Sequence, residues 1–134
     1  MAAHHDALIA IMVLTSAAAH DMTDKELKKM GDVVGNWPVF ENFAVADLPA
    51  TATRISDALE QEDGLEALFD EMQDALSWQL RETAYALACE MAATDGVLTD
   101  EEMQILELVR HRLGIDRLIA AGIERGVRAR FATA

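Results

Sequence analysis

Hydrophobic residues recur along this chain at the spacing of α-helices. The first hydrophobic run is apolar around almost its whole circumference; its members are Leu8, Ile9, Ile11, Met12, Val13 and Leu14. A helix that is apolar on all sides packs in the centre of a protein. We therefore expect a central helix that begins near Asp6, since aspartate is a common N-cap residue.

Six further helices are expected because residues that start or stop helices bound each apolar pattern. They run from Thr23 to about Val34, from Asp47 to about Gln61, from Asp63 onward, from Trp78 to about Thr94, from Thr99 to Gly114 and from Asp116 onward. Pro38 ends the second of the seven helices because it disfavours helical geometry at Trp37. Phe40 and Phe43 are expected to hold the following loop against the core.

Two stretches of the chain, residues 18–27 and 94–103, match one another. Each follows an Ala-rich apolar helix and contains a capping box, in which Thr23 precedes Glu26 and Thr99 precedes Glu102 by three residues. This duplication predicts two related helical hairpins. The sequence leaves open whether they pack with approximate two-fold symmetry. Together with the low aromatic content of 5%, the pattern predicts one all-α domain over residues 1–134, a compact bundle of about seven helices.

The charge of the chain narrows the classes of partner. There are 24 acidic residues against 11 lysines and arginines, a formal charge of −13, which opposes binding to nucleic acid and to anionic lipids. The first apolar run lacks a cationic start and is too short to cross a bilayer, so neither a signal peptide nor membrane insertion is expected. Cys89 is the single cysteine, which excludes an intramolecular disulfide and favours a cytoplasmic location.

The second turn carries the strongest candidate for metal chemistry. Gly96 and Glu102 have the spacing of the later part of an EF-hand loop, but the first and third ligand positions fall on Met91 and Ala93, which excludes an ordinary EF-hand. Asp95 is a carboxylate at the negative end of a helix, with Glu90 about one turn upstream. Asp95, Glu102 and Glu90 are therefore candidate cation ligands. The alternative is that Gly96 and the capping box only stop one helix and start the next.

The chain contains none of the common sequence motifs of enzyme active sites. There is no phosphate-binding loop, nucleophile elbow or zinc pattern. Cys89 is expected to be a buried hydrophobe, and His4 and His5 are expected to lie at a fraying terminus. Trp37 and Trp78 are expected to be half-buried packing residues; the alternative is that an exposed Trp37 beside Pro38 marks a partner-binding spot.

Taken together, the motif from Asp95 to Glu102, its degenerate copy ending at Glu26, and the run Leu80-Arg81-Glu82-Thr83-Ala84 resemble the tellurite-resistance TerB-like family. The resemblance covers nearly the whole chain. It implies a seven-helix bacterial protein of stress responses, with divalent-cation binding or partnership in a membrane-associated complex.

Carried over residue by residue, the acidic motif of the family falls on Asp95 and Glu102, and on Glu26 in the first hairpin. The first hairpin has Ala19 and His20 where Asp-Gly is expected, which places a symmetric two-site cation model in doubt. Three hypotheses follow: a non-enzymatic, cation-responsive adaptor that acts through protein contacts, a metal-free interaction module, and a hydrolase or redox enzyme acting on tellurite. The last would need a pocket with converging titratable groups.

Overall fold

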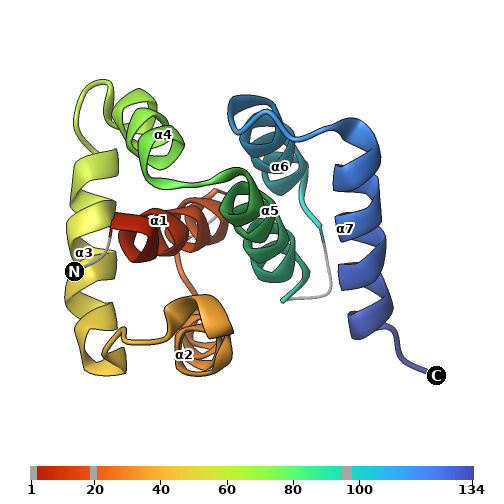
Figure 1. Cartoon of the computed structure of the whole chain (residues 1–134). Coiled ribbons are helices and arrows are strands. Elements are labelled where there is room, and N and C mark those ends of the chain that lie inside the picture. The colour runs from red at the N-terminus through yellow and green to blue at the C-terminus, as the bar shows by residue number, and fades with distance from the viewer. Residues whose placement is uncertain (1–2, 19–20, 95–97) are drawn as a thin grey trace.

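The computed structural model describes residues 3–18, 21–94 and 98–134, and this part of the chain is all-α (Figure 1). Its seven α-helices are α1 (Ala3–Ala17), α2 (Asp24–Asn36), α3 (Leu48–Leu59), α4 (Gly64–Ala75), α5 (Trp78–Ala93), α6 (Asp100–Arg112) and α7 (Arg117–Phe131). Two short 3₁₀ turns, η1 (Pro38–Phe40) and η2 (Val45–Asp47), connect α2 to α3. The expected all-α class and helix number are confirmed.

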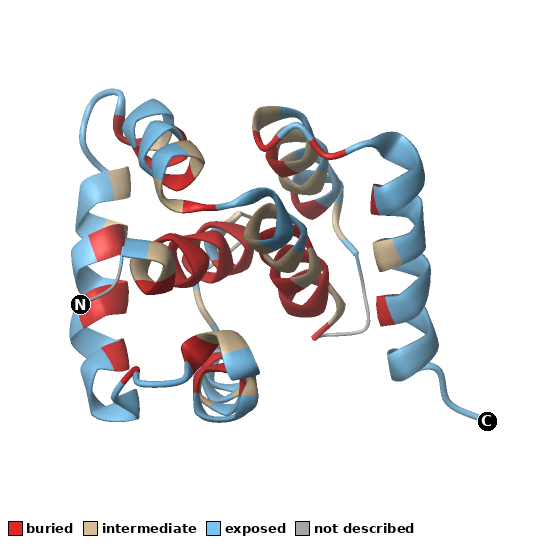
Figure 2. Cartoon of the chain, viewed as in Figure 1, coloured by how far each residue is buried: buried red, intermediate tan, exposed pale blue. Residues whose placement is uncertain are grey.

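The central position predicted for the first helix is confirmed. Every residue of α1 from Ala7 to Ser16 is buried, and α1 contacts α3, α4 and α5. Figure 2 shows that burial is concentrated on α1 and on the facing part of α5. Full burial of one leucine or isoleucine side chain stabilises a fold by about 1.5–3 kcal/mol, so the α1–α5 contact is the main part of the core.

The start of α1 differs from the expectation. The helix begins at Ala3, so Asp6 lies in the first turn and is not the N-cap. The Oδ2 atom of Asp6 instead forms an ion pair with Nη2 of Arg54 on α3, at 3.2 Å. A long-range ion pair of this kind has no signature in the local sequence.

His5 is buried, so the expectation of a fraying position was wrong for this residue. Its Nε2 atom donates a hydrogen bond to the carbonyl oxygen of Val39 at 3.0 Å, and its ring packs on Phe40 and Phe43. Burial, followed by the charge of His4, lowers the pKa of His5. The two phenylalanines hold the connection between α2 and α3 to the core, as predicted.

The helix boundaries follow the sequence signals, with one change of mechanism. Gly114 has a φ of 68° after α6, a left-handed conformation that favours glycine. Ser77 caps α5 by accepting a hydrogen bond from the backbone N–H of Leu80. Asp63 precedes α4 as expected, but it has a φ of 60° and its side chain makes no capping hydrogen bond. The expected helix start is therefore correct, although the Asp63 side chain does not cap the helix.

The two hairpins occupy the two sides of the molecule, with α1 and α5 in the middle (Figure 1). α3 flanks the first hairpin at one edge and α7 flanks the second at the other. α4 adds a further layer against α1 and α3. Within the three described ranges, no helix is both long and apolar enough to cross a membrane.

Candidate functional site

Both capping boxes are present with the predicted partners. In the first, Glu26 N–H donates to Oγ1 of Thr23 at 3.1 Å and Thr23 N–H donates to Oε1 of Glu26 at 3.0 Å. In the second, the same two bonds join Thr99 and Glu102, each at 3.1 Å. Both glutamates are buried. Two of the candidate cation ligands therefore have a structural role at helix N-termini, where a carboxylate stabilises the unpaired N–H groups and the positive end of the helix.

Glu90, the third candidate ligand, is fully buried and paired with two cations. One carboxylate oxygen lies 2.9 Å from Nζ of Lys29 on α2, and the other forms an ion pair with Arg130 on α7. Burial, followed by the charge of Arg130, lowers the pKa of Lys29. Glu90 thus joins α2, α5 and α7, and its charge is balanced by residues from both halves of the chain.

Asp95, the fourth candidate ligand, lies outside the described residues. Within the described ranges, no group of three or more His, Cys, Asp or Glu side chains is arranged to hold a metal ion. The structure therefore does not bring Glu26, Glu90 and Glu102 together as one ligand set. The role of Asp95 in cation binding stays a prediction.

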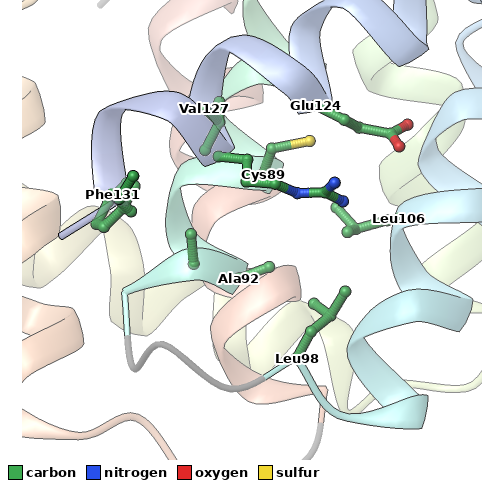
Figure 3. Close-up of a pocket in the computed structure, with 10 residues that line it drawn as sticks. Cys89, Ala92, Leu98, Leu106, Glu124, Val127 and Phe131 are labelled. Atoms are coloured by element: carbon green, nitrogen blue, oxygen red, sulfur yellow. The ribbon is translucent and has the colours of Figure 1, made fainter. Parts of the chain in front are cut away.

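A pocket of about 430 Å³ opens between α5, α6 and α7. Figure 3 shows side chains from these three helices converging on it, with Cys89 and Ala92 on α5. Most of its lining is apolar, and this lining includes Cys89, Ala92, Leu98, Leu106, Val127 and Phe131. Among the described residues, its charged members are Glu124 and Arg128 of α7. A concave, mainly apolar site with few polar groups is typical of ligand and partner binding.

The titratable groups of this pocket are poorly suited to nucleophilic catalysis. Burial, followed by the charge of Glu124, raises the pKa of Cys89 to about 12, so the thiol stays protonated at neutral pH. The hydroxyl of Tyr85 donates a 2.6 Å hydrogen bond to Oε2 of Glu124, and burial and this bond raise the pKa of Tyr85. Because the thiolate is the reactive form of cysteine, the pocket favours binding over covalent chemistry.

The family model for "Tellurite resistance protein TerB" matches residues 5–122. The chain belongs to the TerB family. The matched segment holds both capped hairpins, which carried the resemblance in the sequence. Among curated proteins and among solved structures, no significant match to the chain is found.

Residues 123–131 of α7 lie beyond the segment matched to the TerB family. They provide one wall of the pocket, with Glu124, Val127 and Phe131. Of the residues of α7, only Ala120 and Val127 are buried, and polar contacts add to this small apolar contact. These include the hydrogen bond from Tyr85 to Glu124 and the ion pairs of Arg130 with Glu90 and of Arg117 with Glu107.

Several residues of this region were missed by the sequence analysis. Lys29 and Arg130 gave no local signal, because their pairing with Glu90 depends on how helices from both ends of the chain pack.

The two tryptophans also differ from each other. Trp37 is half-buried as expected, but Trp78 is 65% exposed, with the guanidinium of Arg81 packed 4.7 Å from its ring centre.

Proposed function

We propose that this TerB-family chain is a non-enzymatic stress-response protein of the tellurite-resistance type that acts through protein contacts. The observation that carries the proposal is the incomplete closure of the second hairpin. Leu98 and Phe131 are 47% and 37% exposed, and both line a pocket whose lining is mainly apolar. Exposed apolar groups gathered at a concave surface mark binding sites for other molecules.

The protonation states support contact over catalysis. Within the described residues, the buried carboxylates of Glu26, Glu90 and Glu102 serve caps or ion pairs. The pKa of Cys89, raised to about 12, leaves very little thiolate at neutral pH. A hydrolase or a tellurite reductase would need converging groups with pKa values near the working pH. In this pocket the pKa of Cys89 lies far above neutral pH.

Site-specific photocrosslinking in cells would test the proposal. A photoreactive residue would replace Leu98 in one strain and Leu27 in another, because these leucines are almost equally exposed, at 47% and 48%. Leu27 belongs to the first hairpin and does not line the pocket. We expect protein adducts at position 98 during tellurite stress and few at position 27.

Equal crosslinking at both positions, or none at either, would contradict the contact mechanism. A parallel assay follows the amount of tellurite in solution with the purified protein and a reduced nicotinamide cofactor. We expect no catalytic loss of tellurite. Turnover that scales with protein concentration would replace the proposal with a redox enzyme.

We propose a cation-responsive form of the same function as the second candidate, with Asp95 and Glu102 as ligands. It is favoured by the buried carboxylate of Glu102 at the start of α6, seven residues after Asp95 in the sequence. Glu26 and Glu90 would have to give up their cap and ion pairs to take part. Asp95 follows the last residue of α5 by two positions in the sequence, and a divalent cation bound by it would favour the negative end of a helix.

Calorimetric titration of the EDTA-treated protein with calcium, magnesium, zinc and manganese tests the cation-responsive form. We expect saturable binding that Asp95→Asn weakens by about tenfold or more. Glu102→Gln is a poorer probe, because it weakens the cap whether or not an ion binds. No binding heat with any of the four ions would leave the metal-free interaction module as the function.

A further inference from the structure

The groove between α5, α6 and the C-terminal part of α7 has a chemistry that identifies a class of partner. Resting on the proposed function, we propose that this groove is the docking site for an acidic amphipathic helix of another protein. Apolar side chains of that helix enter the pocket above Cys89 and Ala92. Its carboxylates pair with Arg125 and Arg128 on α7.

The apolar part of the groove has room for such side chains. Its volume of about 430 Å³ would accept two or three leucine-sized groups, each occupying roughly 100 Å³ or more. Leu98 on one side and Phe131 on the other are 47% and 37% exposed, and Figure 3 shows them on opposite sides of the pocket. An apolar helix face inserted between them would cover both, as in helix-in-groove recognition.

The charge of α7 sets it apart from the rest of the chain. α7 contains four arginines and one glutamate, a formal charge of +3 in a protein whose total is −13. Arg128 lines the pocket directly, and Arg125 precedes it by almost one helical turn. Because Arg117 and Arg130 already pair with Glu107 and Glu90, Arg125 and Arg128 are the arginines of α7 that a partner's carboxylates would meet.

Two of these arginines are also available for a partner. Within the described parts of the chain, Arg125 and Arg128 are the arginines without a hydrogen bond or an ion pair to the protein. The other arginines have such partners through their side chains; they are Arg54, Arg81, Arg110, Arg112, Arg117 and Arg130. Arginine pairs with carboxylates in a bidentate geometry, which adds orientation to the apolar contact.

The negative charge of the rest of the protein does not cancel this preference. At physiological ionic strength, charges on exposed groups are screened beyond about 8 Å, so a docked helix responds mainly to the groups that it contacts. Glu124 lines the same pocket, but it accepts the hydrogen bond from Tyr85. The exposed arginines Arg125 and Arg128 outnumber this one carboxylate on the C-terminal part of α7.

A helical peptide tests this assignment directly. The probe is a synthetic peptide of about 18 residues, with leucines at i, i+3, i+4 and i+7 and glutamates on the polar face. A twin peptide carries lysines in place of the glutamates. Fluorescence anisotropy measures the binding of each peptide to the full chain. We expect the acidic peptide to bind saturably and the basic twin to bind with an affinity at least about tenfold lower.

Two charge reversals provide the matched comparison. Arg128→Glu changes the groove, whereas Lys28→Glu makes the same change of charge at an exposed position on α2. We expect Arg128→Glu to lower the affinity for the acidic peptide by about tenfold or more. We expect Lys28→Glu to leave that affinity within about twofold of the wild-type value. Both substitutions are at exposed positions, and circular dichroism would verify that both variants keep their helices.

Three outcomes would overturn the assignment: no saturable binding of the acidic peptide, equal affinity for the two peptides, or equal effects of the two reversals. Dimerisation in sedimentation experiments that Arg128→Glu abolishes would also overturn it, because a second copy of the chain would then occupy the groove. Crosslinking at position 98 tests the proposed function separately. If the acidic peptide does not bind but crosslinking at position 98 is still observed, the acidic helix is excluded as the partner and the proposed function stands.

Discussion

The two hairpins of this protein share their local structure and differ in how completely they are closed. Each residue of the first corresponds to the residue 76 positions later, as Thr23 does to Thr99. The capping bonds agree to within about 0.1 Å between the two hairpins. At the matched positions Met30 and Leu106, however, the first side chain is fully buried and the second only partly.

The difference comes from the segments that follow each hairpin. The connection from α2 to α3 contains η1 and η2 and adds the buried rings of Phe40 and Phe43 to the core. The connection from α6 to α7 spans residues 113–116 only, and α7 buries two residues along its length. The duplicated local motif thus borders two different pockets. One of about 350 Å³ lies between α1, α3 and α4 and is lined by charged side chains such as Asp6, Arg54 and Glu71, and the mainly apolar one of about 430 Å³ lies between α5, α6 and α7.

The largest expected effect contrasts alanine substitutions at the matched core positions. Met30→Ala removes a fully buried side chain and should lower the free energy of unfolding by about 3 kcal/mol, whereas Leu106→Ala should cost about half as much, because its side chain is already partly exposed. Urea denaturation of both variants measures the two losses. Equal losses would show that the second hairpin is as tightly packed as the first.

Removing Arg130 tests the ionic contact that ties α7 to both halves. Arg130→Ala leaves Glu90 buried with Lys29 as its remaining partner, so we expect a loss of about 1–2 kcal/mol in the free energy of unfolding. Arg117→Ala is the control, since Arg117 is 78% exposed and lies 3.6 Å from Glu107. Thermal unfolding should show a lower midpoint for Arg130→Ala than for Arg117→Ala. Identical midpoints would show that the ion pair with Glu90 does not hold α7 in place.

The two capping boxes share one pair of hydrogen bonds, and in the first box the Thr23 hydroxyl also donates to Oε1 of Glu26 at 3.2 Å. Glu26→Gln and Glu102→Gln each weaken the same pair of hydrogen bonds, and each should cost about 1 kcal/mol of unfolding free energy. Chemical denaturation of the two single variants measures these costs. A much larger loss for either one would show that its carboxylate has a role beyond the cap.

The smallest effect is a pH dependence confined to the first hairpin. The pKa of His5 is lowered by burial, so the unfolded chain binds a proton more readily than the folded chain. Stability supplied by neutral His5 is therefore present above about pH 6.5 and is lost as the pH falls toward the lower pKa of the folded state. His5→Gln should flatten the decline in melting temperature below about pH 6.5, and an unchanged slope would contradict this origin.

The sequence predicted the features that depend on near neighbours. The capping residues Thr23 and Thr99, the stop at Gly114 and the central burial of α1 all follow from local patterns. The burial of His5 was missed because its partner Val39 lies 34 residues away, and the ion pairs of Glu90 were missed because Lys29 and Arg130 reach it from distant helices. The pocket was missed for the same reason, since it exists only where α5, α6 and α7 meet.

The central claim is that the open second hairpin carries the function through contacts. The most direct test expresses this chain in a host that lacks its own TerB and measures the tellurite tolerance that the chain restores. The Leu98→Glu and Leu27→Glu variants are compared with the wild type. Both substitutions place one negative charge on a leucine of nearly equal exposure. We predict loss of tolerance with Leu98→Glu and tolerance equal to wild type with Leu27→Glu, at equal protein levels. Full tolerance with Leu98→Glu, or loss with both, would contradict the account.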